Sequence, residues 1–339
     1  MEKDNDRIIV SINCLTYNHA KYIRQCLDGF VMQQTDFRYE AIVHDDASTD
    51  GTTEIVREYA DRYPDIIVPI FESENQYSKG IPGKLTRLLE DRSRGEYIAI
   101  CEGDDYWTDP LKLQKQVEHM ERHPECTMSC NRTKMYSVLR KKYIGENYCY
   151  NKDRTVAVED VVKRGGLFVS TCSVVYRKEI KGPDYPDYCI QCHIGDYPLQ
   201  IMAAMKGTIY YFNDVMSVYR VENSASWAGQ IEGISVDKLI SIVRSEVTML
   251  KGFSLNFPRY SDLFQQRIAA YINCNIPKRG YSSSDQKQYI QAFRNEMTTY
   301  SFLWKVDRFI NSIRIRGIAK VYSFIFLINY SVKLKKYSY

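Results

Sequence analysis

The first 124 residues alternate short apolar runs with stretches in which apolar residues recur every three or four positions. Apolar runs of strand length occupy residues 8–15, 39–44, 65–71 and 97–101. Helix-spaced stretches follow them, at residues 22–31, 52–63, 82–90 and 111–122. Uninterrupted apolar runs are typical of strands buried on both faces of a parallel sheet, and regular alternation with helices implies right-handed crossovers. The pattern therefore predicts an α/β, Rossmann-like fold, with a mostly parallel sheet flanked by helices.

The pattern changes further along the chain. Residues 126–136, 171–176 and 215–220 have strand character, and a helix at 158–164 ends at Gly165-Gly166. From residue 231 the periods are helical only, at 236–250, 259–274 and 285–300. We expect a catalytic domain over residues 1–229, with halves at about 8–124 and 125–229, and a helical C-terminal extension over residues 230–339.

Charge divides the chain at the same place. Residues 230–339 hold 17 Lys and Arg against 7 Asp and Glu, a net charge of +10. Since the whole chain carries +4, the residues before them carry −6. Such a split usually separates two tasks, here an acidic catalytic half from a basic half that faces an anionic partner. We expect no nucleic acid partner.

The ten cysteines do not form a disulfide framework. They are scattered from Cys14 to Cys274, so we expect most of them to be reduced, buried side chains. Residues 189–193 match the C-x-x-C-H pattern of haem attachment, which requires export. The first residues are polar and acidic, whereas a secretory signal would start basic and continue apolar. We therefore expect a cytoplasmic protein.

Three acidic residues follow the run at 97–101 within four positions. Glu102, Asp104 and Asp105 would lie beyond the end of a parallel strand, on a tight turn at Gly103, where open α/β sheets bind ligands. Carboxylates gathered there repel one another unless a cation joins them. Their hard oxygens favour Mg²⁺ or Mn²⁺, which bridge such groups to substrate phosphates. The stretch favours a metal–diphosphate site, and a solvated acidic loop before the next helix is the plainer alternative.

The loop that follows the second strand has its own acidic motif. Asp46, Ser48 and Asp50 match the early positions of a calcium loop, but the twelfth position is Arg57, where a Glu is needed. A nucleotide contact fits better, because a carboxylate at a strand end accepts hydrogen bonds from a ribose or a base. The chain lacks G-x-G-x-x-G after its first strand and also lacks G-x-x-x-x-G-K-[ST]. This argues against a nicotinamide oxidoreductase and a P-loop NTPase.

Three loops, taken in order, carry a resemblance to a known family. They are Thr16-Tyr17-Asn18, residues 45–52, and the run from Glu102 to Asp105. Together they resemble glycosyltransferase family 2, with its GT-A nucleotide-sugar fold, clearly over about residues 8–124 and more weakly to about 223. The resemblance implies an inverting transferase that uses a nucleotide-diphosphate sugar in bacterial-type surface polysaccharide or glycan assembly.

The resemblance also implies roles for single residues. The expected nucleotide contacts are Thr16, Tyr17, Asn18 and Asp46. The expected metal and diphosphate site is Asp104, with Glu102 and Asp105 nearby. Glu102 stands where Asp is usual in the family, so Asp104 is the expected metal ligand.

Asp196 stands where a helical pattern begins, after Gly195. Asp is a good N-cap, which contributes about 1 kcal/mol. Inverting family 2 enzymes place their general base at the start of a helix in this region, so the resemblance implies that Asp196 deprotonates the acceptor hydroxyl. The two interpretations are partly compatible.

Two later segments leave alternatives open. Similar enzymes often have a His just after a Tyr-Arg pair, whereas Val221 follows Tyr219-Arg220 here. Ser224, Ser226 and Trp227 form either a flap over the diphosphate or acceptor, or a plain turn.

The apolar run at 318–330 is flanked by basic residues and is shorter than the roughly 20 residues that span a bilayer. It is either a helix in the membrane interface or a helix docked on the protein. The expected acceptor is a glycan or lipid-linked glycan. In the first case, an anionic membrane surface would be a further partner, with the protein peripheral on the inner face of the membrane.

Two other functions remain as alternatives. A metal-dependent nucleotidyltransferase would also use a carboxylate-bound metal, but it should show a basic Gly-rich loop near its first strand, which this sequence lacks. A catalytically silent nucleotide-sugar-binding scaffold would act through its basic tail.

Overall fold

The computed structural model describes residues 7–80, 83–222, 233–277 and 280–299. The chain divides into two compact units. The first comprises residues 1–161, 166–185 and 199–223, and the second comprises residues 162–165, 186–198 and 224–339. The domain boundary predicted at residue 229 falls outside the described residues and stays a prediction.

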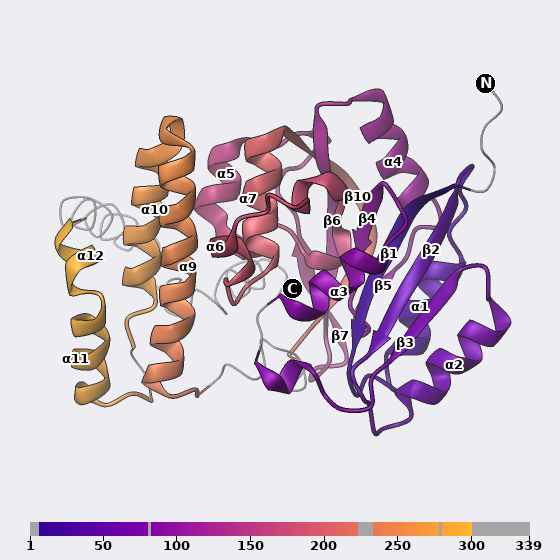
Figure 1. Cartoon of the computed structure of the whole chain (residues 1–339), viewed down its shortest axis with the longest axis horizontal. Coiled ribbons are helices and arrows are strands. Elements are labelled where there is room, and N and C mark those ends of the chain that lie inside the picture. The colour runs from indigo at the N-terminus through magenta and orange to yellow at the C-terminus, as the bar shows by residue number, and fades with distance from the viewer. Residues whose placement is uncertain (1–6, 81–82, 223–232, 278–279, 300–339) are drawn as a thin grey trace. The chain divides into compact units, whose positions relative to one another are not determined.

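The first unit contains one sheet, in the strand order β3-β2-β1-β4-β9-β6-β10-β5, with β7 paired to β6 and β8 to β10 (Figure 1). The strands are β1 (Ile8–Thr16), β2 (Arg38–Asp45), β3 (Ile67–Phe71), β4 (Tyr97–Ile100), β5 (Tyr106–Trp107), β6 (Cys126–Ser137), β7 (Lys142–Asn147), β8 (Arg154–Thr155), β9 (Val175–Arg177) and β10 (Thr208–Val221). β1 is parallel to β2 and β4, and β2 to β3, whereas β9 is antiparallel to its neighbours β4 and β6. The result is a mostly parallel sheet, as the alternation of apolar runs predicts.

The apolar runs form the parallel centre of this sheet because both faces are covered. Ile12 of β1 lies between Ala41 of β2 and Ala99 of β4, and all three side chains are fully buried. The predicted helices follow the strands, as α1 (Ile23–Val31), α2 (Thr52–Arg62), α3 (Lys84–Arg92) and α4 (Lys112–Arg122). Both ends of each helix lie within two residues of the predicted bounds.

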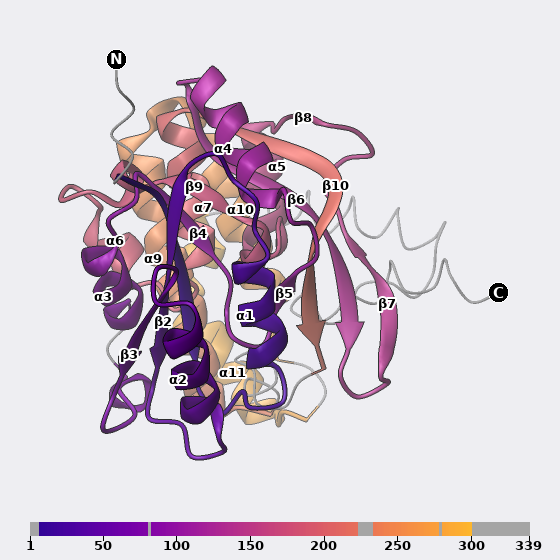
Figure 2. The same cartoon turned by 90° about the vertical axis from the view of Figure 1, so that its right-hand side faces the viewer.

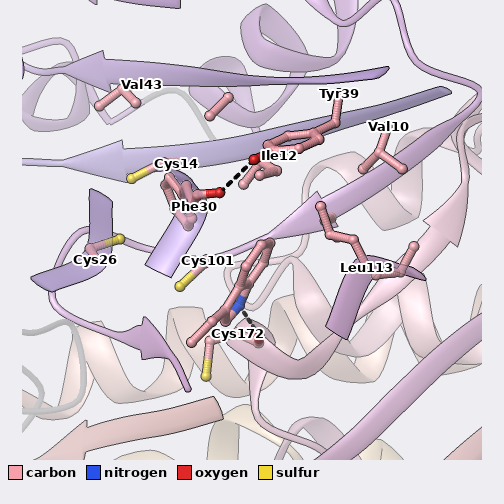
Figure 3. Packing of buried hydrophobic residues seen from close by; sticks show 14 of the residues in the cluster. Val10, Ile12, Cys14, Cys26, Phe30, Tyr39, Val43, Cys101, Leu113 and Cys172 are labelled. Carbon is pink, nitrogen blue, oxygen red and sulfur yellow. Dashed lines mark hydrogen bonds between the residues drawn. The ribbon is translucent and has the colours of Figure 1, made fainter. Parts of the chain in front are cut away.

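Aromatic side chains fill the core between β1 and the helices. Phe30 of α1 meets Trp107 edge-on, with ring centroids 5.1 Å apart. The hydroxyl of Tyr39 donates to the Phe30 carbonyl at 2.9 Å, and Trp107 Nε1 donates to the Cys172 carbonyl at 2.8 Å (Figure 3). Each buried polar tip therefore has a partner, which removes the cost of burying it.

The cysteines are part of this packing. All ten are free, and eight of them are buried. Figure 3 shows Cys14, Cys26, Cys101 and Cys172 among the aliphatic and aromatic side chains of the core. The prediction of reduced, mostly buried cysteines is confirmed.

The second half of the sheet differs from its prediction. Residues 171–176 form a 3₁₀ turn (Thr171–Ser173) before the short strand β9, and β10 begins at Thr208 rather than at residue 215. Register shifts between Phe212 and Ser217 break the two-residue period, so the sequence reveals only the end of β10. β5 and β8 have two residues each, too few for any period.

The second unit is helical where it is described after residue 233. It contains α9 (Val236–Asn256), α10 (Ser261–Cys274), α11 (Ser283–Ala292) and α12 (Arg294–Thr299), preceded in the chain by α6 (Asp187–Ile190). Ser282 and Asp285 form a capping box at the start of α11. α9 and α10 pack through Phe253 and Phe264, whose stacked rings lie 5.7 Å apart. The predicted helical extension is present over these residues.

Two helices pass from one unit to the other. They are α5 (Val158–Arg164) and α7 (Asp196–Lys206). Within the part of the chain that the model describes, no helix is both long enough and apolar enough to cross a membrane. The apolar run at 318–330 and residues 224–227 lie outside the described residues.

Candidate active site

The ends of three parallel strands bring three loops together. The Asp46 N–H, after β2, donates to the Thr16 carbonyl at 3.0 Å, and the Gly103 N–H, after β4, donates to the Leu15 carbonyl at 2.9 Å. Carboxyl ends of parallel strands lie at one edge of a sheet, which is where open α/β sheets bind ligands. Thr16, Asp46 and the 102–105 loop, predicted to share a site, therefore do lie at one edge.

The first two loops are joined side by side through Asn18. Its N–H donates to Ser48 Oγ at 2.8 Å, and its Oδ1 accepts the Thr49 N–H at 2.8 Å. Asn18 has a φ of 54°, a left-handed conformation that Asn adopts more readily than most residues. The structure thus gives Asn18 the task of fixing one loop against the other.

Asp46 is buried and holds a segment beyond the third strand. Its carboxylate accepts the N–H of Gln76 at 2.7 Å and the N–H of Tyr77 at 2.9 Å. Tyr77 belongs to a 3₁₀ turn (Tyr77–Lys79), and its side chain is 59% exposed. Burial raises the pKa of Tyr77, and the charge of Glu102 raises it further. Asp46 therefore positions an exposed ring near the acidic loop.

The acidic loop is packed tightly against β1 and α1. A Cβ at Gly103 would lie 2.6 Å from Thr16 Oγ1 and 2.9 Å from His19 Nδ1, so only glycine fits here. The thiols of Cys26 and Cys101 lie below the loop and donate to the Glu102 carbonyl at 3.5 and 3.8 Å. The loop is thus held from both sides.

The three acidic side chains of the loop differ in environment. Glu102 is exposed, whereas Asp104 and Asp105 are buried. Burial and the neighbouring charge of Asp104 raise the pKa of Asp105 well above its ordinary value. Burial disfavours the charged form of Asp105, so Asp104 and Glu102 are the better candidates to bind a cation.

Arg220, at the end of β10, is distant in sequence from the acidic loop but binds it. Its N–H donates to Asp105 Oδ1 at 2.7 Å, and its guanidinium donates to the Asp104 carbonyl and, at 2.5 Å, to Gln25 Oε1. The guanidinium also lies 4.6 Å from the ring centroid of Tyr106. Arg220 had no predicted role, although an Arg at the end of a strand with a buried face is a usable signal.

His19 is a second residue of this site to which the sequence analysis gave no role. Burial lowers the pKa of His19, while the charges of Asp104 and Asp50 oppose this. The imidazole is therefore mostly neutral at pH 7, and its Nδ1 is buried without a hydrogen-bond partner among the described residues. A neutral imidazole beside Asp104 is able to accept a hydrogen bond or to bind a metal ion.

Asp196, the predicted base, belongs to the second unit. It is the first residue of α7, and one of its carboxylate oxygens is buried. Its charge raises the pKa of Cys192 and of Glu246, which shows that the three side chains are close. Burial raises the pKa of Glu246 to about 7, and the Tyr271 hydroxyl donates to Glu246 at 2.5 Å. Asp196 therefore lies in a partly buried group of ionisable side chains.

Comparison with known proteins decides the family. The family model described as Glycosyl transferase family 2 matches residues 11–181, half of the chain. The chain belongs to glycosyl transferase family 2. This family assignment confirms the resemblance carried by the three loops.

Its relatives include proteins with and without a described activity. An uncharacterised protein of Mycobacterium tuberculosis is 39% identical over 219 residues, which span 64% of this family 2 chain and 60% of the relative. The putative teichuronic acid biosynthesis glycosyltransferase TuaG of Bacillus subtilis is 26% identical over 223 residues, 65% of this chain and 82% of TuaG. The chain thus matches about 60% of the length of the mycobacterial relative.

Two solved structures share the fold of this family 2 chain. TarS 1–349 of S. aureus, in complex with UDP-GlcNAc, has a TM-score of 0.53 at 16% identity, over 89% of this chain and 92% of TarS 1–349. The mannosyltransferase PcManGT from Pyrobaculum calidifontis, in complex with GDP-Man and Mn²⁺, has a TM-score of 0.55 at 16% identity, over 99% and 90% of the two chains. The predicted GT-A fold is confirmed.

The side chains of the acidic loop fit a metal ion whose remaining ligands would come from the substrate and from water. Within the described ranges, no group of three or more His, Cys, Asp and Glu side chains is arranged to hold a metal ion. Mg²⁺ commonly takes one or two protein carboxylates and obtains its other ligands from water and substrate phosphates. Asp104 and the exposed Glu102 have such oxygens, and the charge of Asp104 acts on the neutral His19.

Proposed function

We propose that this family 2 member transfers a sugar from a nucleotide-diphosphate sugar to an acceptor hydroxyl, with inversion at the anomeric carbon. The observation that carries the proposal is Asp104, buried at the carboxyl edge of a mostly parallel sheet beside a neutral His19 and below Arg220. Parallel sheets bind nucleotides at this edge, and carboxylates there suit a diphosphate carried with its cation.

The nucleotide side of the proposed site consists of Thr16, Tyr17, Asn18 and Asp46. Thr16 Oγ1 is buried, and no hydrogen-bond partner for it is found among the described residues, so the hydroxyl is available to a ligand. Tyr17 and Tyr77 are 43% and 59% exposed, and exposed aromatic rings at such sites stack on bases. Asn18 and Asp46 act through the loops that they hold in place.

The diphosphate side consists of Asp104, with Glu102 and Asp105 in the same loop. Asp104 and Glu102 would hold Mg²⁺ or Mn²⁺, which when bound neutralises the charge of the departing diphosphate. Asp105 accepts the Arg220 N–H, so its proposed contribution is to keep the loop in shape. His19 accepts a hydrogen bond at the same place.

The acceptor side rests on Asp196 as general base. A carboxylate that accepts the proton of the acceptor hydroxyl makes the oxygen a better nucleophile at the moment of attack. Its place at the first residue of α7 supports this role, because the helix fixes the side chain. We propose residues 8–124 as the nucleotide-sugar half and residues 125–229 as the acceptor half of the catalytic domain.

The biological setting is proposed from the relatives. TuaG is described as a teichuronic acid biosynthesis glycosyltransferase, and TarS of Staphylococcus aureus as a poly(ribitol-phosphate) beta-N-acetylglucosaminyltransferase. Acceptors of the same kind, a surface glycan or its lipid-linked precursor, are the proposed partners of this chain. The basic residues 230–339 would hold the protein at the inner, anionic face of the membrane.

A panel of nucleotide-sugars with Mn²⁺ tests the proposal. A thermal-shift screen identifies the donor, since a ligand at one hundred times its dissociation constant stabilises a protein by about 2.7 kcal/mol. A turnover assay with the labelled donor then measures transfer or donor hydrolysis. Donor binding without either reaction would favour a silent scaffold, and release of pyrophosphate from a nucleoside triphosphate would favour a nucleotidyltransferase.

A further inference from the structure

The hairpin of β6 and β7 lies at the same edge of the sheet as the acidic loop. β9 is antiparallel both to β4 and to β6, so β6 runs in the same direction as β4. The carboxyl end of β6, and the turn to β7, therefore lie at the edge where β4 leads into the 102–105 loop. Figure 2 shows β7 as the outer strand beside β6.

One face of this hairpin combines exposed aromatic and basic side chains. Tyr136 of β6 and Tyr143 of β7 are paired across the strands, and their rings meet edge-on with centroids 5.4 Å apart. The ammonium group of Lys134 lies 5.6 Å from the centroid of the Tyr143 ring. Tyr143 is 54% exposed. The Tyr143 ring is thus open to solvent, with the half-buried Tyr136 ring against it and a cation beside it.

Tyr143 connects this face to the proposed active site. Its hydroxyl lies 3.0 Å from the hydroxyl of Tyr106, within hydrogen-bond distance. The Arg220 guanidinium lies over the Tyr106 ring and donates to the Asp104 carbonyl. A molecule lying on the hairpin would therefore continue directly toward the acidic loop.

The hairpin has more Lys and Arg side chains than it has ion pairs. Residues 132–146 contain five Lys and Arg and one Glu. Two of the cations have partners, since Arg132 pairs with Glu146 and Arg140 with Glu222. Lys134, Lys141 and Lys142 are exposed, and no ion pair is found for them within the described part of the chain. These three charges are available to an anionic ligand.

We propose that one face of the hairpin (Lys134, Tyr136 and Tyr143), together with Lys141 and Lys142 at its turn, binds a negatively charged acceptor glycan. Lys142 alternates with Tyr143 along β7, so it reaches the ligand from the turn and not from the aromatic face. These five residues are here called the hairpin surface. The inference rests on the proposed transferase function and specifies the chemistry of its acceptor. Sugar rings lie on the tyrosines, and carboxylates or phosphodiesters of the same chain meet the lysines. A neutral glycan would leave the three lysines without a partner.

Direct binding tests this without any need for turnover. The probes are an oligogalacturonide, which carries carboxylates, a ribitol-phosphate oligomer, which carries phosphodiesters, and a neutral dextran oligomer of similar length. The full chain should bind at least one charged probe and not the dextran, with an affinity that falls as salt rises. The charged probe that binds more tightly identifies the anion. Equal binding of dextran, or no binding of either charged probe, would overturn the proposal.

Variants locate the binding on the hairpin. Replacing Lys141 and Lys142 together by Ala should weaken binding about fivefold at low salt, because each exposed charge contributes little. Tyr143→Ala should weaken it by about tenfold, whereas Tyr143→Phe, which keeps the ring, should stay within about twofold. The matched control is Lys287→Ala, an exposed lysine of α11, which should bind like the wild type.

Two further measurements separate the possible failures. Nucleotide-sugar affinity should be unchanged in the Lys141 and Lys142 double variant. Loss of donor binding in this variant would indicate that the site is misfolded. In that case, glycan binding by Tyr143→Phe and Tyr143→Ala would decide whether the hairpin surface binds the acceptor. If anionic phosphatidylglycerol vesicles, and not the glycans, respond to the lysine changes, the hairpin surface faces a membrane and the acceptor inference is wrong. If the charged glycans bind as expected but no donor is ever used, the proposed transferase function fails while the binding surface stands.

Discussion

Arg220 and Asp105 are joined by a 2.7 Å hydrogen bond from the Arg220 N–H to Asp105 Oδ1, although 115 residues separate them in the sequence. The Arg220 guanidinium adds bonds to the Asp104 carbonyl and to Gln25. The last strand of the sheet therefore holds the acidic loop in the shape that its metal and diphosphate would need.

Arg220→Lys should lower nucleotide-sugar affinity by about tenfold to a hundredfold. Lysine keeps the charge but cannot donate to two acceptors and stack between rings at once, and each lost charge-assisted bond costs about 1.5–3 kcal/mol. Calorimetry with the donor and Mn²⁺ measures the change. Arg122→Lys, at an exposed site paired with Glu118, is the matched control. Unchanged affinity in Arg220→Lys would mean that the loop keeps its shape without the guanidinium.

Asp104→Ala should abolish donor binding and transfer together, because the diphosphate charge loses the ion that neutralises it. Exhaustive chelation of the wild type should have the same effect, and added Mn²⁺ should restore activity to the wild type only. Asp91→Ala, an exposed carboxylate of α3, should behave like the wild type. Full wild-type activity after chelation would rule out the metal role.

Asp196→Asn separates a catalytic base from a helix cap. Asn caps a helix about as well as Asp, so stability should barely change. Asn cannot accept the proton, so turnover should fall by roughly 10² to 10⁴-fold while nucleotide affinity stays the same. Transfer rate, calorimetry and thermal unfolding are measured on one preparation. Asp187→Asn, at the first residue of α6, is the control. Transfer within about threefold of the wild type would make Asp196 a cap.

Glu246 should make stability depend on pH. Burial raises its pKa from 4.5 to about 7. The hydrogen bond from Tyr271 and the charge of Arg267 act to lower this pKa, and the charge of Asp196 acts to raise it. The folded state thus keeps a proton that the unfolded state loses, so the free energy of unfolding should fall as pH rises from 4.5 to 7. Gln cannot ionise and still accepts from Tyr271. Glu246→Gln should therefore be more stable than the wild type at pH 8, by up to about 3 kcal/mol, and similar at about pH 4.5.

Thermal unfolding at the two pH values checks this, and Glu296 provides a control of opposite sign. Burial acts to raise the pKa of Glu296, but the hydrogen bond from Lys251 at 2.8 Å lowers it below its ordinary value. Its contribution is present above the unfolded pKa and is lost as pH falls. Glu296→Gln should lose stability at pH 8, whereas Glu246→Gln should gain it. The same sign for both variants would contradict the assignment.

The parallel half of the fold could be predicted because each strand and the loop after it have a recognisable pattern within a few consecutive residues. Strands such as β1 are buried on both faces, so each one is an unbroken apolar run, and the loop that follows carries its polar residues in the same few positions. Thr16, Asp46 and Asp104 could be grouped from sequence for that reason. β5 and β8, by contrast, exist only because a neighbouring strand lies beside them.

The partners of the site residues could not be predicted in the same way. Asp46 binds the N–H groups of Gln76 and Tyr77, and backbone groups have no sequence signature. The raised pKa of Asp105 depends first on burial, which a string of three acids in an apparently polar loop conceals. Arg220 comes to the loop through the pairing of β10 with β5, which has two residues.

The thiols of Cys26 and Cys101, which lie below the acidic loop, provide a way to measure how often this loop opens. Burial raises the pKa of Cys26 well above its ordinary value and that of Cys101 to about 11, so neither thiol is a nucleophile in the closed state. An alkylating reagent can reach them only when the loop or α1 lifts away from the core. The rate of alkylation therefore counts these openings, and a bound donor that holds the loop down should slow it in proportion to its occupancy.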